Sequence, residues 1–271
     1  MPQRETPGPA VPGRGTPQHG TPRGEGVLAR ALRLLDAFDE DTPTRTAREL
    51  GEHAGLPGSS LHRLLGELVA SGLLVRVPGH RYAIGSRMFE LGELSPLALG
   101  LRERSLPHMQ RLYEATGENV HLAVLDGTSP EASAALFVGR VAGRASIPTL
   151  SRTGGRDPLH TTGVGKALLA GRDEGWLARY FSMPLERETV HSITSEAALR
   201  ADLERTRARG YAVAHEEMTL GNVSVAAALP TVAGMPPAAI GVVAHLGRAD
   251  ERVLGAIVAQ TARELGAALR G

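Results

Sequence analysis

The chain has no cysteine among its 271 residues. Disulfides, thiolate zinc clusters and a thiol nucleophile are therefore excluded, and the composition fits a reducing cytoplasm. An apolar signal core is also missing near the N-terminus. The stretch Met218–Gly247 contains no Asp, Glu, Lys or Arg, but Pro230, Pro236 and Pro237 interrupt it. We therefore predict two buried strands joined by a proline turn, no membrane span, and a cytoplasmic protein.

An excess of charge of either sign is absent as well, since 30 basic residues balance 29 acidic ones. A chain this close to neutrality has no polybasic surface, so any contact with DNA has to be local. Lysine occurs only once, at Lys166, in the run Gly163–Lys166. This run resembles the end of a P-loop, but that motif needs glycine where His160 stands and Ser or Thr where Ala167 stands. A nucleotide triphosphate site is not supported, and Lys166 could lie at a pocket rim, at a subunit contact or in solvent.

Residues 1–26 are dominated by proline and glycine, with almost no large apolar side chain. Such a segment cannot bury enough surface to offset its ordering entropy, so we predict a disordered tail. A helix with one apolar face is expected next, from the spacing of Leu28, Ala31, Leu32, Leu35 and Phe38.

Two more short helices are predicted before residue 70. Thr46 and Glu49 form the pattern of a capping box, which starts a helix ending near Gly55. The turn Leu56–Ser60 leads into the third helix, whose apolar stripe consists of Leu61, Leu64, Leu65, Leu68 and Val69.

The hydrophobic period then changes from helix to strand. Leu73–Val77 and His80–Ile84 read as two strands, joined by the tight turn Pro78–Gly79. Three short helices followed by a β-hairpin predict a winged helix-turn-helix over residues 27–85. A helical stretch over residues 86–101 is expected to connect it to a second domain.

The second domain, residues 102–271, is predicted to have an α+β fold with an antiparallel sheet covered by helices. Its first helix should end at Gly117, a residue type that favours the left-handed helix terminus. Strands are expected at residues 119–125, 135–141, 210–215, 223–229 and 238–245. Helices are expected at residues 162–170, 174–181, 195–209 and 250–269.

The third helix has the features of a DNA-reading element. Its leucine stripe leaves Ser59, Arg63, Gly66 and Ala70 on the opposite face. Small residues permit close approach to the major groove, and an arginine can pair bidentately with guanine or grip phosphate. The predicted DNA contacts come from this helix and the following hairpin: Gly58, Ser59, Ser60, His62, Arg63, Arg76, His80 and Arg81.

No catalytic set is assembled in the sequence. His215–Thr219 begins like the zinc motif H-E-x-x-H, but Thr219 stands in place of the second histidine. A Gly-x-Ser-x-Gly nucleophile elbow is missing, and the histidines are scattered. Glu216 and Glu217 are interpreted as a solvated or pocket-edge pair. We predict no catalytic residue, no metal site, no cofactor and no enzyme.

Taken in order, these motifs resemble the IclR family of bacterial transcription regulators over nearly all of the chain after the tail. The segments that carry the resemblance are Arg30–Leu35, Glu49–Leu50, Gly55–Leu65, Arg81–Gly85, Thr116–Leu125, Pro158–Ala170, Arg209–Ala212, Glu216–Glu217 and Gly221. The departures are local. Gly58 stands where lysine or asparagine is frequent, Ser224 where cysteine is frequent, and Ala228 where proline is common.

The resemblance implies a C-terminal GAF-like domain that binds a small-molecule effector and alters DNA affinity. From the residues, Thr161 or Thr162 can cap a helix whose first amides suit a carboxylate or carbonyl. Effector contacts are expected, partly from matching family positions, at Thr162, Gly163, Val164, Ala214, Ser224, Gly241 and Val243. Several are apolar where relatives with small-acid ligands carry polar groups, so we expect an effector larger or more apolar than a simple keto acid.

The leading hypothesis is a regulator, a repressor in preference to an activator, that binds a pseudo-palindromic operator in double-stranded DNA as a homodimer or tetramer. The alternative is a small-molecule sensor that keeps the DNA module but acts through protein partners.

Overall fold

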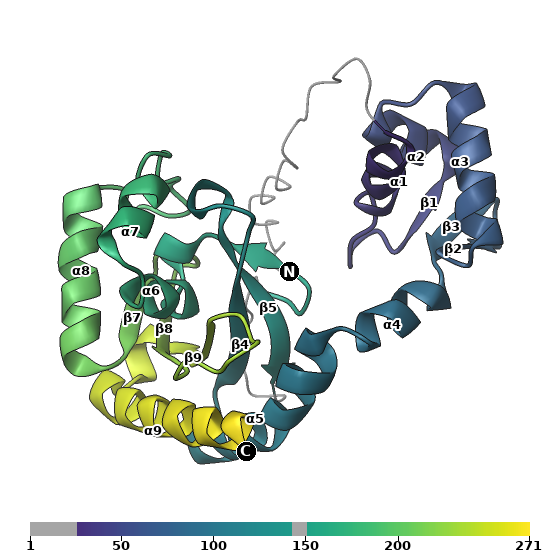
Figure 1. Ribbon diagram of the computed structural model, residues 1–271. Helices are drawn as coiled ribbons and strands as arrows, with labels where there is room; N and C mark the ends of the chain where they lie inside the picture. Colours follow the sequence, from purple (N-terminus) through teal and green to yellow (C-terminus); the bar gives the residue numbers. More distant parts are fainter. Residues whose placement is uncertain (1–25, 143–150) are drawn as a thin grey trace, which may run out of the picture. The chain divides into compact units, whose positions relative to one another are not determined.

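A computed structural model describes residues 26–142 and 151–271 of the chain (Figure 1). Nearly all of the predicted tail therefore lies outside the described residues. The chain divides into two compact units, one ending at Leu91 and the other running from Gly92 to Gly271. We call them the N-terminal unit and the C-terminal unit. Within the described residues, no helix combines the length and the apolar character that a membrane span needs.

The N-terminal unit is a winged helix-turn-helix. Its helices are α1 (Val27–Leu35), α2 (Ala47–Ala54) and α3 (Gly58–Ala70). The wing hairpin consists of β2 (Leu74–Val77) and β3 (Arg81–Ile84), and a third strand, β1 (Thr44–Thr46), pairs antiparallel with β3. The predicted capping box is present, because the Glu49 amide donates to Thr46 Oγ1 at 3.3 Å while Glu49 Oε2 accepts from the Thr46 amide at 2.6 Å.

Two details of this unit differ from the sequence prediction. Helix α1 ends at Leu35, and Leu28 and Leu32 are exposed although they were assigned to its apolar face. The residue of α1 that is fully buried is Leu34, because the helix is rotated toward the core formed with α2 and α3. Strand β1 was not predicted, since Thr-Arg-Thr offers three polar residues and no apolar alternation.

The predicted continuous helix over residues 86–101 is interrupted. Helix α4 spans Ser86–Glu93, and a six-residue π-helix, η1, runs from Leu97 to Arg102 before α5 begins at Glu103. Between α4 and η1 lies Pro96, whose ring disfavours helical backbone at the residue before it. Helix α5 (Glu103–Thr116) ends as predicted at Gly117, which adopts the left-handed conformation with φ 70°.

The C-terminal unit is built on a six-stranded antiparallel sheet with strand order β6-β5-β4-β9-β8-β7. The strands are β4 (Asn119–Asp126), β5 (Ala134–Val141), β6 (Arg156–Asp157), β7 (Ala212–His215), β8 (Asn222–Ala228) and β9 (Ala238–His245). The five predicted strands are confirmed, and the two joined by the proline turn are β8 and β9. The two-residue strand β6 was too short to predict.

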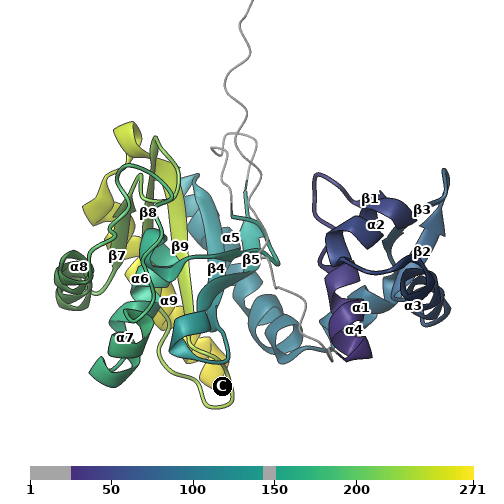
Figure 2. The same ribbon diagram turned by 90° about the horizontal axis from the view of Figure 1, so that it is seen from above.

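Helices cover both faces of this sheet (Figures 1 and 2). Helices α5 and α9 (Glu251–Arg270) pack on one face. The opposite face is covered by α6 (Gly163–Ala170), α7 (Glu174–Tyr180) and α8 (Glu196–Arg209). Successive side chains of strand β4 point to opposite faces of the sheet. Val120 and Leu122 belong to the α5–α9 core, whereas Ala123 belongs to the α6–α8 core. Short 3₁₀ turns lie at Pro130–Ala132, Leu159–Thr161 and Leu246–Arg248.

Candidate functional site

Helix α3 presents one buried and one exposed face, as its sequence predicts. Leu61, Leu64, Leu65 and Leu68 are buried in the core of the N-terminal unit. Gly58, Ser59, His62, Arg63 and Gly66 are exposed, and Ser60 is half-buried. The guanidinium of Arg63 donates to Glu67 Oε1 at 2.7 Å on the solvent side of the helix. The helix therefore offers a small, polar surface with one arginine that a competing acceptor can draw away from Glu67.

The wing brings further basic residues next to α3. Arg76 and His80 are exposed, and a surface hollow is lined by His62 of α3 together with residues of the hairpin, including both of these side chains. His80 lies in the turn before β3, not in the strand, and adopts a left-handed backbone with φ 56°.

Arg81, also predicted to contact DNA, forms hydrogen bonds within the N-terminal unit. Its Nε donates to Thr44 Oγ1 at 2.9 Å, and its terminal nitrogen donates to the Thr44 carbonyl at 2.7 Å and lies 3.5 Å from Glu49 Oε2. These bonds tie β3 to β1 and to the start of α2. Because its Nε and one of its two terminal nitrogens are used within the unit, we leave Arg81 out of the DNA-contacting set proposed below.

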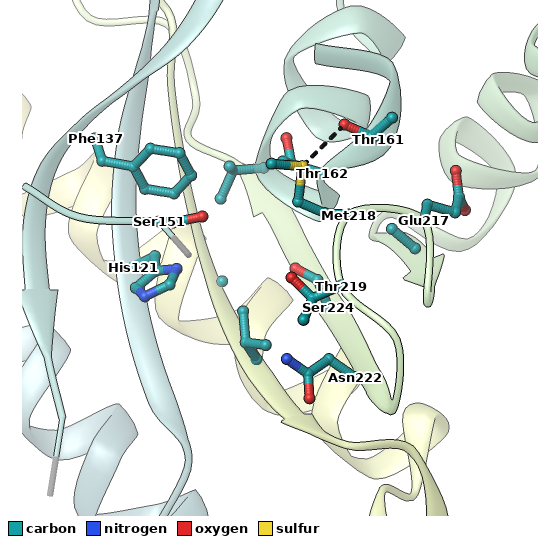
Figure 3. A pocket seen from close by; sticks show the side chains of 14 residues that line it. His121, Phe137, Ser151, Thr161, Thr162, Glu217, Met218, Thr219, Asn222 and Ser224 are labelled. Carbon is teal, nitrogen blue, oxygen red and sulfur yellow. Dashed lines mark hydrogen bonds between the residues drawn. The ribbon is translucent and has the colours of Figure 1, made fainter. Parts of the chain in front are cut away.

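The C-terminal unit contains a cavity between the N-terminal end of α6 and the sheet face beneath it (Figure 3). It encloses about 500 Å³ of space free of atoms, including the part open to solvent. His121 and Phe137 form one side and face Thr219, Asn222 and Ser224 on the other. The described residues that line it are His121, Phe137, Ser151, Thr161, Thr162, Val164, Ala214, Glu217, Met218, Thr219, Asn222, Ser224, Gly241 and Val243.

Six of the seven residues expected to contact an effector line this cavity: Thr162, Val164, Ala214, Ser224, Gly241 and Val243. Thr162 also caps α6, since its Oγ1 accepts from the Gly165 amide at 3.1 Å. The seventh, Gly163, is not in the lining. A Cβ at position 163 would lie 2.5 Å from Ser224 Oγ, so this glycine lets α6 approach β8 closely.

His121 contributes a buried imidazole to the cavity wall. It is 3% exposed, its ring meets Phe137 edge-on at 5.3 Å between centroids, and its Nε2 has no hydrogen-bond partner within the described residues. Burial, assisted by the charge of Arg140, lowers the pKa of His121 from 6.5 to about 4. The imidazole is therefore neutral near pH 7 and can donate and accept one hydrogen bond each.

This pKa makes stability depend on pH. In the unfolded chain His121 binds a proton near pH 6.5, but in the folded chain only near pH 4. Protons therefore favour unfolding across that window, and stability present above pH 6.5 is lost as the pH falls toward 4. We expect this residue to account for a loss of about 3 kcal/mol.

The measurement is urea unfolding between pH 4 and 8, followed by the fluorescence of Trp176, the only tryptophan in the chain. His121→Phe should flatten the pH profile, whereas replacing the exposed His245 by Asn should leave it unchanged. An equal pH dependence in wild type and His121→Phe would contradict the assignment.

Behind the cavity, Lys166 forms a buried ionic cluster. Its side chain is 0% exposed, and its Nζ lies 2.5 Å from Glu217 Oε1 and 2.9 Å from Asp202 Oδ2. Asp202 is held in turn by Arg205 at 3.0 Å. With two cations and two carboxylates, the four groups can balance each other. None of the three locations considered for Lys166 from the sequence is correct, because it lies inside the unit between α6, α8 and β7.

Glu217 joins this cluster to the cavity. It is 5% exposed and lines the cavity, so of its two predicted settings the pocket edge is confirmed and the solvated one is wrong. Burial raises the pKa of its carboxyl above the ordinary value, although Lys166 opposes that change. One oxygen faces Lys166, and the other, Oε2, has no hydrogen-bond partner within the described part of the chain. The sequence did contain a signal for the burial of Lys166, since the other residues of α6 are all apolar or glycine and a helix that is apolar all round is usually buried.

The comparisons with known proteins agree with this architecture. The family model for the IclR helix-turn-helix domain matches residues 27–78, and the model for the bacterial transcriptional regulator IclR C-terminal domain matches residues 97–267. Together they cover most of the chain.

Curated relatives match along most of their length. The chain is 34% identical over 254 residues to the transcriptional repressor IclR of Escherichia coli (strain K12), covering 90% of both chains. It is 35% identical over 247 residues to the HTH-type transcriptional regulator BhcR of Paracoccus denitrificans (strain Pd 1222), covering 89% of this chain and 86% of the relative.

A solved structure with the same fold contains a ligand. It is an IclR homolog from Microbacterium hydrocarbonoxydans complexed with 4-hydroxybenzoate, with a TM-score of 0.83 and 31% identity, covering 90% of this chain and 99% of that one. The winged helix-turn-helix and the sheet domain thus define a DNA-binding transcription regulator. The chain belongs to the IclR family.

Proposed function

We propose that the N-terminal unit binds operator DNA by inserting α3 into the major groove. The observation that carries this proposal is the exposed face of α3, where small residues surround Arg63 above a fully buried leucine stripe. Ser59, Ser60, His62 and Arg63 would contact bases and phosphates. Arg76 and His80 of the wing would contact the backbone or the minor groove. Gly58 permits close approach at the start of the helix.

The C-terminal cavity is proposed as the site of the controlling effector. Its wall combines an aromatic ring, aliphatic side chains, several hydroxyls and a neutral imidazole, a combination that suits a compact, largely apolar molecule with a few polar groups. The described residues of the lining include no lysine or arginine. The 4-hydroxybenzoate complex of the Microbacterium neighbour supports a small hydroxylated aromatic compound as the ligand class.

The regulator is proposed to be a cytoplasmic homodimer or tetramer that represses transcription from a pseudo-palindromic operator and has no catalytic activity. Self-association is supported by exposed apolar side chains on and just after α4, where Phe89 is 70% and Leu94 is 71% exposed. A two-fold protein would present two copies of α3 to two half-sites of the operator. Binding of the effector would shift the relative stability of DNA-competent and incompetent arrangements.

Arg63→Ala is the variant that tests DNA reading. It should weaken operator binding by about 1–3 kcal/mol if Arg63 pairs with a base. The matched control is Arg48→Ala, because Arg48 is also an exposed arginine of the N-terminal unit with a glutamate partner four residues later. Fluorescence anisotropy with the full-length protein and a labelled operator measures the operator affinity of both variants.

The control should bind the operator with nearly wild-type affinity. Equal losses of operator affinity in the two variants would show that Arg63 contributes only its charge to DNA binding. No loss in either would favour the alternative, a sensor that acts through protein partners.

A further inference from the structure

The C-terminal unit contains a second cavity, at the opposite end of α6 from the first. Leu168 and Gly171 line it at the C-terminal end of the helix, whereas Thr162 and Val164 line the first cavity at the N-terminal end. The second cavity encloses about 630 Å³ free of atoms, including the part open to solvent. Its other walls are the β8–β9 connection, residues 229–237, together with Leu269 of α9 and Leu101 of η1.

Among the described residues that line this second cavity, the side chains are apolar except for those of Thr231 and Arg172. Leucine, proline, valine and methionine are the commonest types among these residues, and Leu101 and Leu168 are buried. Arg172 is the only charged residue among the lining residues. An apolar cavity with one cationic group has the composition of a site for an amphiphilic anion.

Arg172 has no partner that would explain its position. Its side chain is half-buried, and its Nε is buried without a hydrogen-bond acceptor in residues 26–142 and 151–271. Within the same residues, no carboxylate forms an ion pair with it. A partly desolvated guanidinium is costly unless an anion or acceptor satisfies it.

The simplest structural role for Arg172, capping the C-terminal end of α6, is already filled. The carbonyl of Ala170, the last residue of α6, accepts from Arg207 Nε at 2.8 Å. Arg207 also pairs with Glu204, so its guanidinium is satisfied on both sides. Arg172 therefore lines the cavity with no carboxylate partner among the described residues.

From these observations we propose that the second cavity is a binding site for a carboxylate carried on an apolar chain or ring. Arg172 holds the carboxylate by charge-assisted hydrogen bonds, and the leucines, prolines and Met235 enclose the apolar body. This site is separate from the effector cavity.

The π-helical segment η1 is the element that such a ligand would order. Leu101 of η1 forms part of the cavity wall, and the Met235 methyl lies 3.2 Å from the position that a Cβ on Gly100 would occupy. Interruptions of α-helical geometry of this kind often occur at functional sites. Along the chain, η1 follows directly after α4 and the boundary between the two units.

The binding test uses isothermal titration of the full-length protein with octanoate and with 4-phenylbutyrate, which represent chain and ring sources of the same carboxylate. Octanol is the neutral comparison. We expect octanoate to bind at least about tenfold more tightly than octanol, because the alcohol cannot form the charge-assisted bonds. Arg172→Gln should weaken octanoate binding by a similar factor. Arg263→Gln, which removes an exposed arginine on α9, should leave octanoate binding unchanged.

Localisation comes from hydrogen exchange. Octanoate should slow exchange of the amides in residues 97–102 and 229–237, and Val243→Phe, which changes only the first cavity, should leave its binding intact. The proposal is overturned if no carboxylate binds, if octanol binds as tightly as octanoate, or if protection appears only around the first cavity. If Arg172→Gln fails to fold, the affinity of Arg172→Lys for octanoate and the wild-type comparison of octanoate with octanol still test whether the cavity binds a carboxylate.

Discussion

Replacing Lys166 by methionine is expected to lower the free energy of unfolding of the C-terminal unit by about 3–5 kcal/mol. The variant keeps an unbranched side chain, one heavy atom shorter than that of lysine, and removes its charge. Glu217 would then be left buried without its cation, and Asp202 would keep only Arg205. The loss follows from leaving carboxylates desolvated and uncompensated, so it should far exceed that of deleting a surface pair.

Urea unfolding followed by Trp176 fluorescence measures the effect, because Trp176 belongs to the C-terminal unit. A second variant separates charge from packing. Lys166→Met combined with Glu217→Gln removes one of the stranded carboxylates and should recover part of the loss. As a control, Arg205→Gln should cost less than Lys166→Met, because its side chain is 60% exposed. A loss below about 1 kcal/mol for Lys166→Met would contradict the buried cluster.

Filling the first cavity should abolish the response to effector while leaving operator binding intact. Val243 is suited to this change, because alternation along β9 places it with Gly241 on the sheet face that lines the cavity, whereas Val242 points to the α5–α9 core. Val243→Phe would occupy space that a ligand needs. We expect affinity for 4-hydroxybenzoate, the probe, to fall by at least about tenfold.

The matched control for this variant is Val253→Phe, which adds the same ring at a 52% exposed position of α9. It should bind the probe as the wild type does. Titration calorimetry measures the affinity for 4-hydroxybenzoate, and fluorescence anisotropy with labelled operator checks that Val243→Phe still binds DNA. Undiminished binding of 4-hydroxybenzoate by Val243→Phe would place its site elsewhere.

Local patterns predicted much of the fold because the residues responsible lie close together in the chain. The leucine stripe of α3, the Thr46–Glu49 capping box and the glycine that ends α5 are each set by neighbours within a few residues. The strands of the C-terminal sheet were also predictable, since their apolar residues are bounded by turns. Strand β1 was missed, because its three residues show no pattern of their own and pair only through β3.

The features that could not be predicted depend on residues far apart in the sequence. Lys166 is buried because Asp202 on α8 and Glu217 after β7 converge on it, and no spacing rule connects these positions. Similarly, Arg81 is occupied by Thr44 on a strand that was itself not predicted. For the cavity, positions taken from the resemblance to the IclR family identified most of the wall, but they did not include His121 or Glu217.

The most direct test of the central claim is selection of bound sequences by the full-length protein from a pool of random DNA duplexes. We expect enrichment of one motif with two-fold related half-sites about one helical turn apart, or a multiple of that distance. Arg63→Ala should lose the preference at a base in each half-site, whereas Arg48→Ala should select the wild-type motif. A pool that shows no enriched motif with the wild-type protein would contradict a sequence-reading role for α3.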